Sequence, residues 1–193
     1  MLISRDKIVE FALDVFDIFA FLIFVGGIVL CIRFFVANPY TVVGASMSPT
    51  FEENDFIIVD KISPRISPWE RWDVVVFVPP GKNIPYIKRI IGLPGETVKI
   101  EKGNVYVCSD KLNCQELDET YLPADLETKA RCWLTEFSVD TGSLFVLGDN
   151  RGFSTDSSCC FGLWCYKWAT YNVPYGNIIG KVYVRLLPTF GFF

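Results

Sequence analysis

The chain has 193 residues, 51% of them hydrophobic, and a formal net charge of −4. Nucleic-acid-binding surfaces are usually basic, so this charge balance argues against a nucleic-acid partner. The sequence contains no histidine, which excludes Ser-His-Asp and Cys-His catalysis and every metal site that needs an imidazole ligand. It also lacks a CxxC pair, so no metal and no cofactor are predicted.

Residues 1–38 are predicted to form an N-terminal segment with a single transmembrane anchor. The run from Ile18 to Ile32 is uninterrupted and apolar, and with its apolar neighbours up to Val36 it reaches the roughly 20 residues that a bilayer requires. A removable signal peptide is the alternative, because Val43-Gly44-Ala45 has the small-x-small form of a cleavage site. The run is longer than the usual h-region of about 7–15 residues, which favours a retained anchor.

Six cysteines follow the apolar run, and a seventh, Cys31, lies inside it. An even set in one region is typical of disulfides formed in an oxidising compartment, with unpaired buried thiols as the alternative. We therefore expect a single-pass protein of the cell (plasma) membrane whose main domain lies on the extracytoplasmic side. Only five residues separate Cys108 from Cys114, and this pair is predicted to be bonded. The pairing of the other four cysteines stays open: Cys132, Cys159, Cys160 and Cys165. One option is a bond to Cys165 from either Cys159 or Cys160.

Residues 39–193 are predicted to form an all-β domain, so the fold class is mainly β, with an N-terminal transmembrane helix ahead of it. Short segments rich in β-branched and aromatic residues alternate with Gly and Pro turn signals, and no long helical periodicity follows the anchor. An inserted subregion is expected at about residues 108–140 and an extra loop at about residues 159–172. The predicted strands are Phe56–Val59, Val74–Val78, Tyr86–Ile91, Thr97–Ile100, Val105–Val107, Leu144–Leu147 and Lys181–Leu187.

The extra loop, residues 159–172, is crowded with aromatic side chains. Aromatic rings with a polar tip favour the membrane–water interface, so we expect this loop to dip into the interface beside the anchor. Trp164 and Trp168 carry this prediction. The alternative is that the aromatic residues fill a core or cover a sheet edge.

Three segments contain residue types that suit catalysis. Ser46 lies in the segment Gly44–Thr50, shortly after the anchor, and a third segment, Gly148–Ser157, is dense in small polar groups. Lys88 and Arg89 point to opposite faces of a predicted strand, so one cation must enter an apolar side of the sheet. Burial can lower a lysine pKa from about 10.4 by up to ~3–5 units, and a neutral lysine can take the proton of a serine hydroxyl. Taken alone, each segment has a simpler interpretation. The Ser46 segment can be a turn, Lys88 a surface lysine, and the third segment a polar loop.

Together these segments resemble the three motif boxes of the bacterial type I signal peptidases. Ser46-Met47-x-Pro49-Thr50 resembles the nucleophile box, and Tyr86-Ile87-Lys88-Arg89 with Gly92-Leu93-Pro94-Gly95 resembles the lysine box. Gly148-Asp149-Asn150-Arg151 with Ser154 and Asp156 resembles the third box. The order and spacing match behind an N-terminal anchor. The resemblance implies an all-β signal-peptidase-like catalytic domain with a Ser-Lys dyad, and thus the activity of signal peptidase I, a serine endopeptidase.

The resemblance also implies roles for single residues. Ser46 would attack the scissile carbonyl, Lys88 would be the general base, and Ser154 would hydrogen-bond the lysine amine. The Ser46 backbone N–H would help form the oxyanion hole, whereas Gly44 stands where some relatives carry a hydroxyl donor and has no side chain to donate. The expected ion pairs near the site involve Arg89, Asp149, Asp156 and Arg151.

The implied substrate is a secretory preprotein with small side chains at the −1 and −3 positions. It would lie extended along the site by strand addition, and the expected partners are such preproteins and the lipid bilayer, with no nucleic acid. The oligomeric state is not predicted. The predicted substrate groove consists of Pro39, Tyr40, Thr41, Val42, Val43, Met47, Ile84, Tyr86 and Ile87.

The sequence departs from the family pattern in places and leaves other functions open. Gly152-Phe153 stands where many relatives have Asp-Asn, and Ser158 where many have arginine. The alternatives are a specialised or organelle-type peptidase of the same superfamily, a self-cleaving repressor-like protease, and a catalytically inactive membrane-anchored β scaffold. A repressor would carry a DNA-binding domain in place of the apolar run, and an inactive scaffold would be expected to lose Ser46 or Lys88.

Overall fold

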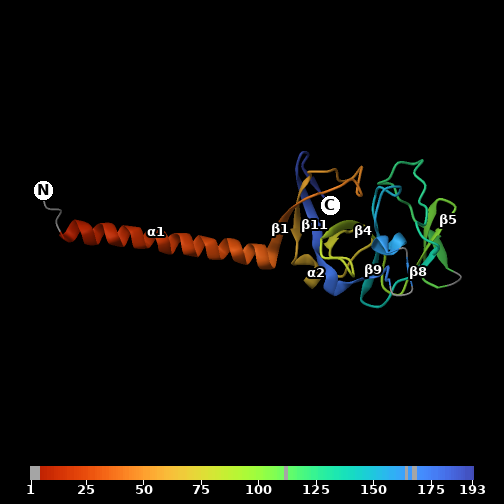
Figure 1. Cartoon of the computed structure of the whole chain (residues 1–193), viewed down its shortest axis with the longest axis horizontal. Coiled ribbons are helices and arrows are strands. Elements are labelled where there is room, and N and C mark those ends of the chain that lie inside the picture. Colours follow the sequence, from red (N-terminus) through yellow and green to blue (C-terminus); the bar gives the residue numbers. More distant parts are fainter. Residues whose placement is uncertain (1–4, 111–112, 164, 167–168) are drawn as a thin grey trace.

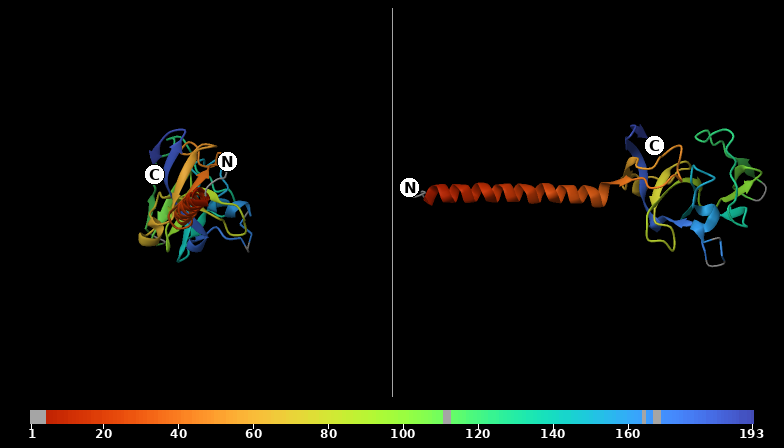
Figure 2. Two further views of the ribbon diagram at one scale, coloured as in Figure 1. Left: turned by 90° about the vertical axis from the view of Figure 1, so that its left-hand side faces the viewer. Right: turned by 45° about the horizontal axis from the view of Figure 1, so that its top comes forward.

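A single N-terminal helix projects from a β domain (Figure 1). The computed structural model describes residues 5–110, 113–163, 165–166 and 169–193. Helix α1 (Arg5–Cys31) continues into a π-helical turn, η1 (Ile32–Val36), and it runs away from the domain as a separate rod (Figure 1 and Figure 2, right). Its apolar stretch Leu13–Val36 has 24 residues, a mean hydropathy of 2.7 and no buried residue. This is the one helix among the described residues that is long and apolar enough to cross a membrane.

The main sheet confirms the predicted mainly β fold. It has eight strands in the order β1-β2-β11-β3-β4-β9-β10, with β12 paired to β11, and every pair is antiparallel. All seven predicted strands are present, five of them in this sheet. Its strands are β1 (Ala37–Thr41), β2 (Phe56–Asp60), β3 (Val74–Phe77), β4 (Tyr86–Gly92), β9 (Ser143–Leu147), β10 (Val173–Pro174), β11 (Ile178–Leu187) and β12 (Gly191–Phe192).

A second, four-stranded sheet occupies the end of the domain away from α1 (Figure 1). Its order is β7-β6-β5-β8, and its hairpin begins at Thr97, ahead of the insertion expected from about residue 108. Residues 117–135, between β7 and β8, contain no strand. The strands are β5 (Thr97–Glu101), β6 (Asn104–Cys108), β7 (Cys114–Glu116) and β8 (Glu136–Ser138), and the short helices of the domain are α2 (Ser63–Ile66), η2 (Ser157–Gly162) and η3 (Tyr175–Asn177).

The central strands of the main sheet are covered on both faces. Every residue of β3 and β9 is buried, which explains why both read as continuous apolar runs rather than alternating ones. One core cluster lies beneath the Ser46 turn and includes Val42, Met47 and Phe51. The core therefore fixes the positions of both the turn and the strand β4 that carries Lys88.

The cysteines form two disulfides among the described residues. Cys108 is bonded to Cys114, as the five-residue spacing predicts, and Cys160 is bonded to Cys165. Cys132 and Cys159 are free, although the Cys132 Sγ lies 2.9 Å from the Cys165 Sγ. The sequence left open whether Cys159 or Cys160 bonds to Cys165, and the structure selects Cys160.

The aromatic residues of the extra loop divide between core and surface. Phe161 is fully buried with its ring 5.7 Å from that of Phe77, and Tyr171 packs edge-on against Phe137 at 5.2 Å. Trp164 and Trp168, which carry the membrane-interface prediction, lie outside the described residues. That role stays a prediction, whereas Phe161 and Tyr171 follow the alternative of core packing.

Candidate active site

Ser46 sits on a turn that is anchored on both sides. The next residue, Met47, and Phe51 are fully buried in the core below the turn, and this burial holds Ser46 at the surface. From above, the Asn150 side chain donates to the Ala45 carbonyl at 2.9 Å and the Asn150 backbone N–H donates to the Ser46 carbonyl at 3.2 Å. The loop after β9 therefore fixes the backbone of the candidate nucleophile.

Lys88 enters the site from β4 and is 2% exposed. Its Nζ donates to the Ser46 Oγ at 2.6 Å and to the Ile87 carbonyl at 2.6 Å. Burial lowers the pKa of Lys88 to about 8, against the opposing attraction of Asp156, Asp149 and Cys159. At pH 7, about a tenth of the amines with such a pKa are neutral, compared with about three in ten thousand for an unperturbed lysine. The amine therefore has both the position and the pKa of a general base.

The predicted hydrogen bond from Ser154 to the lysine amine is not present. Ser154 is buried, yet its Oγ has no hydrogen-bond partner among the described residues. The lysine amine is oriented instead by the carbonyl of its own neighbour, Ile87. The role of Ser154 was implied by the family resemblance, whereas a contact with a backbone carbonyl leaves no signature in the sequence.

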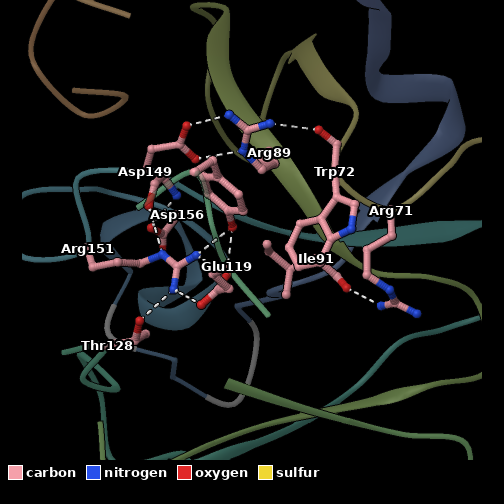
Figure 3. A network of polar contacts seen from close by, with 11 residues as sticks. Arg71, Trp72, Arg89, Ile91, Glu119, Thr128, Asp149, Arg151 and Asp156 are labelled. Carbon is pink, nitrogen blue, oxygen red and sulfur yellow. Dashed lines mark hydrogen bonds and ion pairs between the residues drawn. The ribbon is translucent and has the colours of Figure 1, made fainter. Parts of the chain in front are cut away.

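Arg89, on the opposite face of β4 from Lys88, is also buried and forms the predicted ion pair with Asp149. Its Nε and Nη2 donate to the two carboxylate oxygens at 2.9 and 2.6 Å, and its Nη1 donates to the Trp72 carbonyl at 2.9 Å (Figure 3). Such a two-pronged pair is both strong and directional. It joins the strand that carries Lys88 to the loop that holds Ser46.

The other two predicted ion-pair residues behave differently. Arg151 pairs with Glu119, a residue between β7 and β8 that no sequence pattern indicates. Asp156 forms no ion pair among the described residues, and Ser158 contacts its carboxylate instead. Its buried carboxylate accepts from the backbone N–H of Gly148 at 3.0 Å and from the Ser158 backbone N–H and hydroxyl at 3.1 and 2.7 Å. The expectation of an Asp156 ion pair is thus wrong.

A groove of about 560 Å³ opens beside the Ser46–Lys88 pair. Two predicted residues do not line it: Met47 is buried in the core, and Pro39 lies farther along β1. Ile57, Val76, Phe153 and Thr155 line it in addition to the predicted positions. The lining residues are Tyr40, Thr41, Val42, Val43, Gly44, Ala45, Ser46, Ile57, Val76, Ile84, Pro85, Tyr86, Ile87, Lys88, Phe153 and Thr155.

Both walls of this groove present an unpaired strand edge. Strand β1 is the edge of its sheet and, within the described part of the chain, pairs with β2 alone. In β4, residues 86–88 pair with β3, while the pairing with β9 begins at Arg89. An extended peptide between the two walls could therefore add backbone hydrogen bonds to either edge.

Gly44 has a positive φ of 82°, and no atom lies within 4 Å of the place where a Cβ would stand. The obstacle to a side chain is therefore the backbone conformation, which costs a non-glycine residue about 1–3 kcal/mol. We expect Gly44→Ser to lower activity rather than to supply a useful oxyanion donor. Gly44→Ala separates backbone strain from the effect of the added hydroxyl in an assay of initial rates. Equal losses of rate in the alanine and serine variants indicate backbone strain. A serine variant faster than wild type would contradict the prediction.

Comparisons with known proteins identify the family of this chain. Residues 15–187 match the profile of a family described as signal peptidase, peptidase S26. Signal peptidase I of Leptolyngbya laminosa is 41% identical over 169 aligned residues, covering 82% of this chain and 73% of that protein. Signal peptidase I of Bacillus caldolyticus is 36% identical, covering 83% and 85%, and signal peptidase IB of Staphylococcus aureus (strain COL) is 31% identical, covering 95% and 92%. A crystal structure of a signal peptidase I from Enterococcus faecalis V583 matches with a TM-score of 0.44 and 27% identity, covering 60% of this chain and 97% of that one.

Proposed function

The chain belongs to the signal peptidase family, peptidase S26, and we propose that it is a membrane-bound Ser-Lys endopeptidase that removes signal peptides from secretory preproteins. That it is a peptidase follows from the family. The mechanism, the cleavage preference and the anchoring are the proposal. The observation that carries it is the 2.6 Å hydrogen bond between the buried Lys88 Nζ and the Ser46 Oγ.

The geometry supports an acyl-transfer reaction in two stages. The neutral Lys88 amine takes the Ser46 hydroxyl proton while the Oγ attacks the scissile carbonyl, and the protonated amine then gives this proton to the leaving amino group. An ester to Ser46 remains, and a water molecule hydrolyses it with Lys88 again as base. The backbone N–H of Ser46 donates to no group among the described residues, so it is free to bind the oxyanion.

The groove supports a preference for an extended substrate. A chain lying between β1 and β4 directs alternate side chains to the same wall, so the −1 and −3 residues of a preprotein would both face the apolar lining near Ser46. We propose that small side chains are preferred at these two positions. The apolar helix α1 would hold the groove beside the bilayer on the extracytoplasmic side, where a translocated preprotein presents its cleavage site.

Incubating the detergent-solubilised protein with a secretory preprotein tests this function. The wild-type chain should release the mature protein after a small residue, as mapped by mass spectrometry, and Ser46→Ala should release none. A preprotein with phenylalanine in place of its −1 alanine should resist cleavage. Cleavage by Ser46→Ala at the wild-type rate would overturn the assignment of the nucleophile.

The pH dependence should report the lowered pKa of Lys88. Because the neutral amine is the active form, kcat/KM should rise about tenfold for each pH unit below about 8 and level off above it. The measurement is the rate on a peptide substrate between pH 6 and pH 10, with circular dichroism as a check on folding. A rate that keeps rising through pH 10 would mean that burial does not depress the pKa of this lysine.

A further inference from the structure

We propose that Glu119 and Tyr121, in the strandless stretch between β7 and β8, are positioning residues that hold Ser46 and Lys88 at the right distance from each other. The inference rests on the proposed function and deepens it. Neither residue lines the groove, so neither is expected to contact substrate. They act on the dyad through two buried arginines, Arg151 and Arg89.

Arg151 links Glu119 to the loop that holds Ser46. Its side chain is 1% exposed, and its guanidinium donates to four different groups, of which Glu119 and Thr128 are labelled in Figure 3. Nε donates to the Gly148 carbonyl at 3.2 Å, and Nη1 and Nη2 both donate to the Glu119 carboxylate. A buried guanidinium that loses its carboxylate is left with an uncompensated charge. Glu119 therefore keeps Arg151 in place, and through it the Gly148 carbonyl.

Two hydroxyl groups complete the coordination of Arg151. Nη1 also donates to the Thr128 Oγ1 at 2.5 Å and Nη2 to the Tyr121 hydroxyl at 2.9 Å. The Tyr121 hydroxyl in turn donates to the Glu119 carboxylate at 2.6 Å. Residues 119–128 thus wrap the guanidinium with a carboxylate and two hydroxyls, which matches its fork of donors.

Tyr121 also reaches the second arginine. The centroid of its ring lies 4.1 Å from the Arg89 Cζ, a stacked arrangement that an arginine and an aromatic ring favour. Arg89 adjoins Lys88 on β4 and pairs with Asp149. The ring of Tyr121 therefore contacts Arg89, on the strand that carries the base. Its hydroxyl contacts Arg151, on the loop that holds the nucleophile.

This arrangement matters because Ser46 and Lys88 come from different elements. Their own hydrogen bond does not fix the distance between those elements, and a displacement of about 1 Å at a reacting group can cost ~10²-fold in rate. A defect at Glu119 or Tyr121 should therefore appear in kcat, with KM unchanged, since the substrate walls are not touched.

Glu119→Gln tests the proposal against a matched control in the same stretch. Glu127 is an exposed acid that pairs with Lys129 and does not contact Arg151, so Glu127→Gln should keep the wild-type kcat. Glu119→Gln should lower kcat by about 10–10²-fold with KM unchanged, while circular dichroism shows a folded domain at the assay temperature. Its peptide covering residues 44–50 should also exchange amide hydrogen faster than in wild type.

Tyr121 variants give an independent readout. Tyr121→Phe keeps the ring over Arg89 and loses the hydroxyl, so it should retain more activity than Tyr121→Leu, which loses both. The wild-type rate and the Ser46→Ala blank establish the proposed function separately from these variants. If wild type cleaves but folded Glu119→Gln and Tyr121→Leu match it in kcat and in hydrogen exchange, the positioning role is wrong and the proposed function stands. If wild type cleaves no preprotein, the proposed function fails, and hydrogen exchange alone still decides whether this stretch holds the Ser46 turn.

Discussion

Replacing Lys88 by methionine or arginine is expected to abolish cleavage while leaving the domain folded. Methionine has no basic group, and arginine keeps its proton at every accessible pH, so neither can activate Ser46. A positioned general base contributes about 10²–10⁴-fold to the rate, and loss of the base together with the hydrogen bond to Ser46 should leave no measurable product. The measurement is single-turnover cleavage of a preprotein with enzyme in excess.

Lys88→Met is expected to stabilise the folded domain although it abolishes cleavage, and this gain in stability serves as the control for the loss of activity. Because the folded-state pKa of about 8 lies below the ordinary value of 10.5, the native structure holds the charged amine at a cost of up to about 3 kcal/mol below pH 8. This cost disappears as pH rises from 8 to 10.5, where the unfolded chain binds more protons. Lys88→Met should therefore unfold at higher urea concentration than wild type at pH 7, and the difference should shrink toward pH 10.

An inactive Lys88→Met that is also less stable than wild type at pH 7 would contradict this account, since the lost activity could then reflect a lost fold. Retained cleavage by a folded Lys88→Met would exclude the lysine as base. Lys88→Arg distinguishes the two roles of the side chain, because it keeps a charge in the site and should be the less stable of the two variants.

Strands with a strong intrinsic pattern were predictable, and strands that depend on pairing were not. Val74–Phe77 is β-branched and aromatic throughout, so its sequence alone predicts a buried strand. Strand β1 contains Asn38 and Pro39, which disfavour strands, and it forms because β2 pairs with it along one edge. At the edge of a sheet the missing N–H of a proline removes no ladder bond.

The candidate site shows the same division. Ser46, Lys88, Arg89 and Asp149 lie in segments whose residue types and order could be recognised, and the fold brings them together. Glu119 lies in a stretch without periodicity, and its contact with Arg151 spans 32 residues, so nothing local indicates it. The Ser154 and Asp156 contacts differ from expectation because they depend on which group fills each hydrogen-bonding direction, a matter of packing.

Gly148 is a point of close approach between the nucleophile turn and the third polar segment. A Cβ built on Gly148 would collide with the Ser46 carbonyl oxygen and with both side-chain atoms of Ser154. Backbone cannot yield as the end of a flexible side chain can, so Gly148→Ala must change the spacing between this loop and the Ser46 turn.

We expect Gly148→Ala to lower kcat/KM by about 10²-fold, since the 2.6 Å contact between Lys88 and Ser46 would open. Overpacking should also lower the free energy of unfolding by about 1–3 kcal/mol. Gly152→Ala is the matched control, because it lies in the same loop and its Cβ would meet no atom within 4 Å. Peptide cleavage and urea unfolding of both variants, measured where wild type is fully folded, decide the matter. A Gly148→Ala enzyme as fast as Gly152→Ala would show that the spacing between this loop and the Ser46 turn does not control the reaction.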